Sequence, residues 1–328
     1  MKKHLILSFL SVILFSVGTA FGYSHAFLWD ASNGPRDLGS LGGDSVAYAI
    51  NDSGTVVGYY VPLDKPYEHG FIWSEATGMV DLGIPGGGDS TNAKCLPTAI
   101  NSAGNVVGYA RQVNGRQVAF FWSPVGGFTT IGDLTSAADN GNTAYAINDR
   151  DEVTGNFLVQ RLGPYHAYVW TPGRLHPRDL GVIDGEQYSV GWGINNLGQI
   201  VGGSMSISDS QWQPMTWTRQ AGMSFLGAIS GGARAINDAG QIIGGVDAGP
   251  FYTDRYRGLK LLKGFGGQFT YALAINQPGV IVGNSSDTTH APVGVMWATP
   301  SSVPVALPLD EAIGLNNVGQ VVGEAFVQ

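Results

Sequence analysis

The sequence predicts an all-β protein, a seven-bladed β-propeller whose blades are four-stranded antiparallel sheets. Three observations predict it. A segment built around an Asn-x-x-Gly turn recurs seven times, and an aromatic segment that usually ends in Trp recurs between its copies. The two ends of the chain each carry one half of this unit. A unit of about 44 residues that holds four short strands is typical of a propeller blade.

The first element of each unit is a hairpin around the recurring Asn. In the first copy, AINDSGTVVG over residues 49–58, apolar and small residues alternate before the turn, which indicates a strand. Asn favours the first turn position, Gly supplies a positive φ, and the β-branched residues after it favour a returning strand. Asp151 replaces the Gly in one copy, where we expect a left-handed backbone. Pro278 is disfavoured at its turn position, so the sixth hairpin should differ. The anchors are Asn51, Asn101, Asn148, Asn195, Asn237, Asn276 and Asn316, separated by 50, 47, 47, 42, 39 and 40 residues.

The aromatic segment predicts the third strand, and an Asp-Leu-Gly segment that often follows predicts a weaker fourth strand. Its Trp side chains recur at one blade position, which indicates packing between blades. The sixth copy, residues 249–252, lacks the Trp. The seven copies cover residues 25–29, 69–73, 118–122, 166–170, 213–217, 249–252 and 293–297. Asp-Leu-Gly occupies residues 37–39, 81–83 and 179–181, with a reduced form at 226–227.

Closure of the ring is expected from the chain ends. The chain after the first 22 residues opens with the second half of a unit and closes with the first half, so the two halves can complete one blade. Pairing them removes two sheet edges, which would otherwise be aggregation sites. An open β-solenoid, or a ring with one extra or one missing blade, is the alternative.

The first residues predict export. Lys2 and Lys3 precede a 13-residue apolar run, and small residues follow it, as in a signal peptide. We therefore divide the chain into a signal peptide, 1–22, and one propeller domain, 23–328, secreted to an extracellular or periplasmic destination as a monomer. An uncleaved N-terminal anchor is the alternative. No later segment approaches the length of a membrane span.

Composition limits the partners. The formal charge is −8, and removal of two signal lysines leaves 15 basic against 25 acidic residues, or −10. This charge disfavours nucleic acid and anionic membranes as partners. Glycine is abundant, with 49 residues, which fits short strands and tight turns. Cys95 is the single cysteine, so no intrachain disulfide can form, and we expect it to be a buried apolar residue.

These repeated segments resemble the probable extracellular repeat proteins, known as the HAF family. The triplet His25-Ala26-Phe27, the Asp-Leu-Gly segments and the AINxxGxVVG segments carry the resemblance, which covers about residues 24–328. The resemblance implies a bacterial exported protein. It implies no established activity, cofactor or catalytic residue. The segment at 249–252 departs from the family pattern.

No motif predicts catalysis, a metal or a cofactor. His25, His69 and His166 occupy one position in three different blades, so each should pack beside the hairpin of its own blade rather than share a metal. The turns lack the full calcium-loop pattern, and the Gly-rich stretch at 86–91 lacks the Lys of a phosphate loop. No Gly-x-Ser-x-Gly elbow appears. Four loop acids are the candidates for sugar hydrolysis, although solvated loop acids are the simpler interpretation: Asp184, Glu186, Asp310 and Glu311.

The predicted function is that of a non-catalytic binding or interaction scaffold for an extracellular protein or polysaccharide. The links between second and third strands vary most, and loops carry function. Trp192 and Trp212 fall outside the repeated Trp series, so packing between repeats does not explain them. The alternative is an exported polysaccharide-acting enzyme, a glycosidase or lyase with acids at the channel mouth; a structural envelope role ranks third. The predicted ligand residues are Tyr60, Lys65, Tyr67, Arg111, Arg116, Arg161, Tyr165, Trp192 and Trp212.

Overall fold

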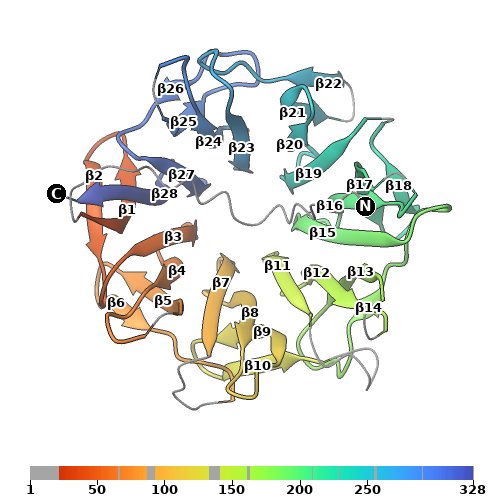
Figure 1. Cartoon of the computed structure of the whole chain (residues 1–328), viewed down its shortest axis with the longest axis horizontal. Helices are drawn as coiled ribbons and strands as arrows, with labels where there is room; N and C mark the ends of the chain where they lie inside the picture. The colour runs from red at the N-terminus through yellow and green to blue at the C-terminus, as the bar shows by residue number, and fades with distance from the viewer. Residues whose placement is uncertain are drawn as a thin grey trace, which may run out of the picture.

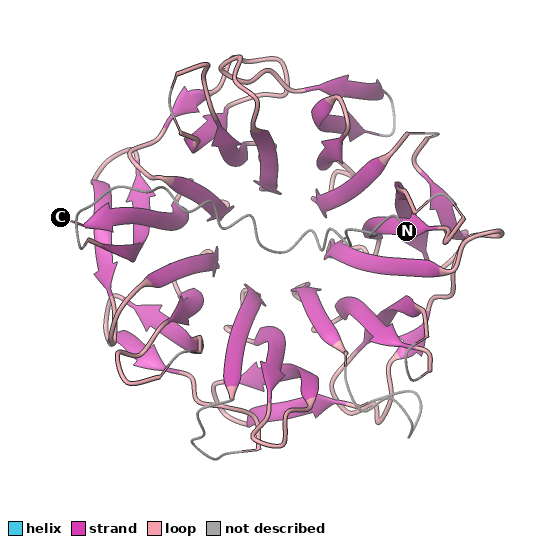
Figure 2. Cartoon of the chain, in the orientation of Figure 1, coloured by secondary structure: helices cyan, strands magenta, loops and turns pink. Residues whose placement is uncertain are grey.

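The computed structural model is a ring of seven four-stranded antiparallel sheets, which confirms the predicted β-propeller (Figure 1). It describes residues 22–65, 67–86, 93–132, 141–160, 163–208, 210–227, 229–254, 257–289 and 291–327. Within this part of the chain, all regular elements are strands (Figure 2). None of the described segments forms a helix long and apolar enough to cross a membrane.

Each blade contributes one strand to each of four concentric positions. The innermost strands are β3 (Ser45–Ile50), β7 (Lys94–Ile100), β11 (Thr143–Ile147), β15 (Tyr188–Ile194), β19 (Gly231–Ile236), β23 (Thr270–Ile275) and β27 (Glu311–Leu315). The second strands are β4 (Val56–Tyr60), β8 (Val106–Arg111), β12 (Val153–Leu158), β16 (Ile200–Met205), β20 (Ile242–Val246), β24 (Ile281–Ser285) and β28 (Val321–Val327).

The two outer positions hold the aromatic segments and the short fourth strands. The third strands are β1 (Tyr23–Asp30), β5 (His69–Ser74), β9 (Gln117–Ser123), β13 (Tyr165–Trp170), β17 (Trp212–Thr218), β21 (Gly249–Asp254) and β25 (Val293–Trp297). The outermost strands are β2 (Gly34–Gly39), β6 (Gly78–Asp81), β10 (Gly127–Ile131), β14 (Arg178–Asp179), β18 (Gly222–Phe225), β22 (Arg257–Leu261) and β26 (Val305–Ala306). We number the blades 1 to 6 from β3–β6 to β23–β26; blade 7 contains β27, β28, β1 and β2.

Blade 7 closes the ring with strands from both ends of the chain. Its order is β2-β1-β28-β27, and β1 pairs with β28 from Tyr23 opposite Val327 to Trp29 opposite Val321. Neither strand of this pair has a free edge, because β2 and β27 cover the two sides of the sheet. The shared blade predicted from the repeat halves is therefore present.

The seven recurring Asn residues form a second closure of the ring, made of hydrogen bonds. Each side-chain amide donates from Nδ2 to the main-chain oxygen of the Asn in the next blade, over 2.9–3.1 Å, and Asn316 donates to Asn51 to complete the circle. Each Asn Oδ1 also accepts from the main-chain N–H four residues later, as in Asn51 and Thr55. The sequence interpretation gave these residues a turn role, which is correct, and missed the contact between blades.

The turns themselves follow one geometry. Asp151 has φ of 58°, as expected for the residue that replaces Gly. The expectation that Pro278 would alter the sixth hairpin is wrong. The Gly279 N–H still donates to the Asn276 oxygen at 3.0 Å, and the Val280 N–H donates to Asn276 Oδ1 at 2.8 Å. Neither contact uses the N–H that proline lacks, so the turn is preserved.

The repeated Trp side chains pack between blades, as predicted. Phe121 of blade 2 lies 5.8 Å, centroid to centroid, from Trp170 of blade 3. The guanidinium of Arg36 in blade 7 lies 5.0 Å from the Trp73 ring centroid in blade 1. Cys95 is fully buried in a neighbouring core cluster, and burial raises the pKa of its thiol above the ordinary value. Blade-to-blade packing of this kind holds the inner strands around the axis.

Candidate functional site

The ring has two faces. The hairpin face carries the seven Asn-x-x-Gly turns between first and second strands; the link face carries the links between second and third strands and those between blades (Figure 1). The described members of the predicted ligand set are distributed over blades 1 to 4. Arg111 is exposed, and Lys65, Tyr67 and Arg116 are half-buried, all on blades 1 and 2. Arg161 lies outside the described residues.

Tyr60 is wrongly placed among the predicted ligand residues. It is the last residue of β4, and its side chain is only 6% exposed. The phenol donates to Asp81 Oδ2 at 3.1 Å, and the ring lies 5.7 Å from that of His69. An apolar ring packed inside its own blade, with its hydroxyl partnered, offers no surface to a ligand.

Tyr165, Trp192 and Trp212 come together in an aromatic cluster on blades 3 and 4, joined by Tyr188. Tyr165 lies 4.9 Å from Tyr188 and 6.2 Å from Trp212, the latter nearly parallel at 24°. Trp212 lies 5.6 Å from Trp192. All four side chains are half-buried. The cluster begins at the link face, where β13, β15 and β17 start, and reaches inward along β15 to Trp192.

Two glycines make room for these indoles. A Cβ on Gly203 would lie 2.7 Å from Trp212 and 3.0 Å from Trp192, and a Cβ on Gly232 would lie 2.3 Å from Trp192. In blade 1, Tyr59 occupies the position of Gly203, and Val46 occupies the position of Gly232. Val46 pairs with Tyr59, as its blade 4 counterpart Val190 pairs with Gly203. The repeat therefore loses side chains where the two extra tryptophans lie. The two glycines and the two tryptophans therefore fit one another as parts of one packed cluster.

Trp192 belongs to a ring of seven residues that we call the axial residues. Each inner strand has a register shift three residues before its Asn, which leaves one residue bulged, such as Trp192 between Gly191 and Gly193. The flanking small residues are turned into the blade, since Ala47 and Ala233 are fully buried. A bulge re-aims a side chain. The axial residues are Tyr48, Thr98, Tyr145, Trp192, Arg234, Leu273 and Ile313.

The axial residues lie on the innermost strand of each blade, and the bulge directs them toward the axis of the ring. Arg234 of blade 5 interacts with Tyr145 of blade 3 and Tyr48 of blade 1. Burial lowers the pKa of the Arg234 guanidinium below its ordinary value, although water still reaches this exposed side chain. A sequence signal for the axial residues exists, because each is a single variable and often large residue between recurring small residues, in several blades alanines.

Glu311 and Glu324 form an acidic pair on the opposite side of the ring, in blade 7. They are directly opposed on β27 and β28. Burial raises the pKa of Glu311 to about 7, with contributions from Glu324 and Asp310. Burial also raises the pKa of Glu324. A hydrogen bond donated by Ser24 Oγ at 2.5 Å partly opposes this rise. Glu311 was a sequence candidate; Glu324 was missed, because only the strand register brings it beside Glu311.

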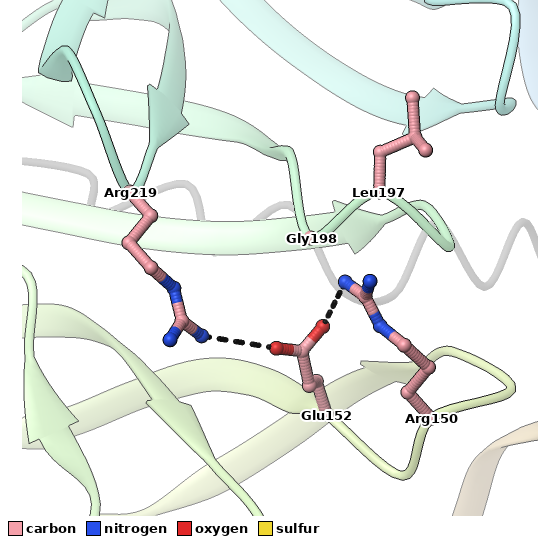
Figure 3. Close-up of a pocket in the computed structure, with 5 residues that line it drawn as sticks. All are labelled: Arg150, Glu152, Leu197, Gly198 and Arg219. Atoms are coloured by element: carbon pink, nitrogen blue, oxygen red, sulfur yellow. Dashed lines mark hydrogen bonds and ion pairs between the residues drawn. The ribbon is translucent and has the colours of Figure 1, made fainter.

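The hairpin face holds two cavities of a different kind. One, of about 230 Å³, lies on the axis and is lined by the Asn ring and its neighbouring residues. The other, of about 410 Å³, surrounds Glu152, whose carboxylate lies between Arg150 and Arg219 at 2.7 and 3.2 Å (Figure 3). Burial opposes ionisation of Glu152, but hydrogen bonds from Asn148 and Arg150 and the two arginine charges hold its pKa below the ordinary value. The carboxylate and the two guanidinium groups neutralise one another's charges. We therefore interpret this cavity as the surroundings of an ion pair that links blades 3 and 4.

The recurring histidines lie against strands of their own blades, and the structure adds an Asp partner that the sequence interpretation did not name. His25 Nδ1 lies 3.0 Å from Asp37, and His166 Nδ1 lies 3.1 Å from Asp179. The Asp in each case also accepts the N–H of the Gly in its Asp-Leu-Gly segment, at 2.7 Å. This pairing explains why the His and Asp-Leu-Gly segments occur together. Within the described residues, no group of three His, Cys, Asp or Glu side chains could hold a metal ion.

Comparison with known proteins shows the fold. No protein-family model matches the chain. No curated protein matches it either. Among solved structures, it is similar to a putative TolB from Agrobacterium tumefaciens, with a TM-score of 0.52 and 10% identity over 94% of this chain and 100% of that one.

Two further solved structures are similar. One is the β-propeller domain of the Trilobed protease from Pyrococcus furiosus, with a TM-score of 0.58 and 11% identity over 89% of this chain and 99% of that one. The other is a puromycin hydrolase, with a TM-score of 0.57 and 14% identity over 85% of this chain; the match spans about half of that protein, 49%. At these identities the likeness is one of fold, and the chain shares the β-propeller architecture of proteins with different activities.

Proposed function

We propose that the chain is an exported recognition protein that binds an extracellular ligand on the link face, at the aromatic cluster of Tyr165, Tyr188, Trp192 and Trp212. The contact of these four half-buried rings carries the proposal. Export rests on the signal-like residues 1–22 and on the resemblance to the HAF family of extracellular repeat proteins.

Aromatic side chains of this kind suit recognition. Tyr and Trp provide large contact areas at low entropic cost, and they are enriched where one partner binds another. The cluster lies on strands β13, β15 and β17, so the rigid blades position it rather than the variable links alone. Packing between repeats accounts for the other six tryptophans but not for these two.

A binding screen tests this function. The purified chain without residues 1–22 is presented to immobilised polysaccharides and to purified extracellular proteins, alongside a Trp212→Ala variant. We expect a ligand that the unmodified protein binds and that the variant binds at least about tenfold more weakly, as for an aromatic hot spot.

Phe326→Ala is the matched control. Phe326 is an aromatic residue, 63% exposed, at the link-face end of β28 in blade 7, on the other side of the ring. Its loss should leave binding unchanged. Equal weakening by both substitutions, or none by Trp212→Ala, would contradict the site.

A second candidate function, hydrolysis or lysis of a polysaccharide, is favoured by the acidic pair in blade 7. A carboxyl group with a pKa of about 7 can act as a general acid near neutral pH, and an adjacent carboxylate can act as the second group. The same screen should be assayed for released reducing sugar. Product that disappears in Glu311→Gln would replace the recognition function with an enzymatic one.

A further inference from the structure

Arg234 is the cationic member of the seven axial residues. It is the bulged residue of β19 in blade 5, with Ala233 paired to Gly244 before it and Ala235 paired to Ile243 after it. The side chain is exposed to solvent. The bulge on this innermost strand directs the side chain toward the axis, and the phenols of Tyr145 and Tyr48 act on its charge.

The guanidinium has no partner within the described part of the chain. No hydrogen bond or ion pair to it is formed there, and the groups that act on its charge are two phenols rather than a carboxylate. Arginine is a strong donor to carboxylates, with a planar fork that matches the two oxygens. Among the described residues, neither Glu311 nor Glu324 forms an ion pair with Arg234.

The aromatic cluster lies beside this cation. Trp192 is the axial residue of the preceding blade, and its indole lies over Gly232, two residues before Arg234 on the same strand. The main-chain oxygen of Arg234 in turn would be 3.0 Å from a Cβ on Gly193. A ligand whose ring lies on Trp192 and Trp212 would therefore extend toward the guanidinium.

We propose that the ligand is an acidic saccharide, whose sugar ring stacks on Trp192 and Trp212 and whose carboxylate binds Arg234. This inference rests on the proposed function and deepens it by naming the ligand class. The C–H face of a pyranose is apolar and matches an indole, while the ring hydroxyls can bond to water and to Tyr188 or Tyr145 at the edge. The carboxylate of the sugar binds the guanidinium of Arg234, the cationic member of the axial residues.

The charge of the molecule limits the ligand to few carboxylates. The chain carries a formal charge of −8, and Glu311 and Glu324 lie in blade 7 near the same axis. A polyanion such as a long polyuronate or an acidic peptide would meet repulsion at several residues. A saccharide with one terminal uronic or sialic acid presents a single charge to Arg234, which we expect to be favoured.

Calorimetric titration of the chain without residues 1–22 tests the inference. The probes are oligosaccharides ending in glucuronic or sialic acid, each with a match in which the carboxyl is reduced to the alcohol. We expect the acidic member of at least one pair to bind about tenfold more tightly. In Arg234→Gln that preference should vanish, with affinity for the neutral match unchanged; Arg234→Lys should restore part of it.

The outcomes separate this inference from the proposed function. Equal binding of acidic and neutral members, lost in Trp212→Ala, would overturn the acidic ligand and leave recognition at the cluster intact. An unchanged preference in Arg234→Gln would overturn the role of Arg234. Tighter binding of an oligoglutamate peptide than of every saccharide would overturn the saccharide class. Failure of every saccharide to bind also overturns it, and the broader protein and polysaccharide screen then decides the proposed function.

Discussion

The axial residues differ in chemistry from blade to blade, although they occupy one repeated position. Around one circle stand two tyrosines, a tryptophan, an arginine, a threonine and two aliphatic side chains, each on the same bulge of its own inner strand. Because the bulge fixes where a side chain points, a single substitution there changes the chemistry at the axis without altering the sheet. Glu311 of the acidic pair adds a titratable group two residues before the axial residue Ile313 on β27.

Glu311→Gln should stabilise the protein in alkaline solution. The pKa of Glu311 is about 7 in the fold and near 4.3 in an unfolded chain, so the folded state holds a proton that the unfolded state releases between these pH values. Its contribution to stability is fully present below about pH 4 and is lost as pH rises through 7. After allowance for solvent screening, we expect the variant to gain about 1 kcal/mol, or roughly 2–4 °C, at pH 8.

Thermal melts at pH 8 and pH 4.5 measure this effect. The gain should shrink at the lower pH, where both proteins are neutral at this position. Asp184→Asn removes an exposed link carboxylate and serves as the control, with no comparable gain. A difference between Glu311→Gln and the unmodified protein that does not vary with pH would show that the effect is not ionisation.

Residue roles were only partly predictable from the sequence. Trp192 and Trp212 stood out because they broke the repeated Trp pattern, but their contact with each other was found only in the structure. Tyr60 was misassigned because a strand end and a link look alike in one sequence, whereas burial separates them. Glu324 and Arg234 needed strand register and blade order, which sequence spacing does not supply.

At the scale of elements, the hairpin is the unit that joins blade to blade. Its Asn closes the turn through Oδ1 and reaches the neighbouring blade through Nδ2. The recurrence of Asn rather than Asp or Ser follows from this double use, because only an amide provides an acceptor and a donor at that reach. The sequence interpretation predicted the strands and turns, and the sixth hairpin was misjudged because its hydrogen bonds do not involve the N–H that proline lacks.

Asn276→Ala should measure the strength of this joint. The substitution removes the bond from Nδ2 to the Asn316 oxygen at 3.0 Å and the bond from Val280 to Oδ1 at 2.8 Å, both in a buried setting. Loss of buried partners costs about 1–3 kcal/mol. Chemical denaturation should show a lower midpoint by that amount.

Val318→Ala is the control for the hairpin substitution. Val318 lies in the turn of blade 7, 67% exposed, and truncation of its side chain should change stability by less than about 0.5 kcal/mol. If Asn276→Ala were as mild as this control, the hydrogen-bonded ring would not contribute to stability.

At the scale of the whole molecule, we expect closure of blade 7 to make the ring unfold as one cooperative unit. Blade 7 draws its two inner strands from the C-terminal segment and its two outer strands from the N-terminal segment. The repeat halves at the chain ends predicted this arrangement, because a half-unit at each end can be completed only by the other. What the halves could not predict is the chemistry that the closed circle brings together on the axis.

Removal of residues 321–328 should therefore disrupt the whole fold. The truncation deletes β28, which pairs with both β1 and β27, and leaves two sheet edges unpaired. We expect the truncated chain to lose its cooperative melt in circular dichroism and to aggregate in gel filtration. Removal of residues 1–22 is the matched truncation and should leave both measurements unchanged. A monomeric truncated chain with an unaltered melt would show that blade 7 is dispensable.

The central claim is that ligand binds at the aromatic cluster, and tryptophan NMR tests it most directly. The chain has eight tryptophans, so 15N labelling gives eight indole N–H signals, two of which can be assigned with Trp192→Phe and Trp212→Phe. On addition of the ligand from the screen, those two signals should shift while the six from the repeated series stay in place. Shifts confined to the repeated series, or equal shifts throughout, would contradict recognition at this cluster.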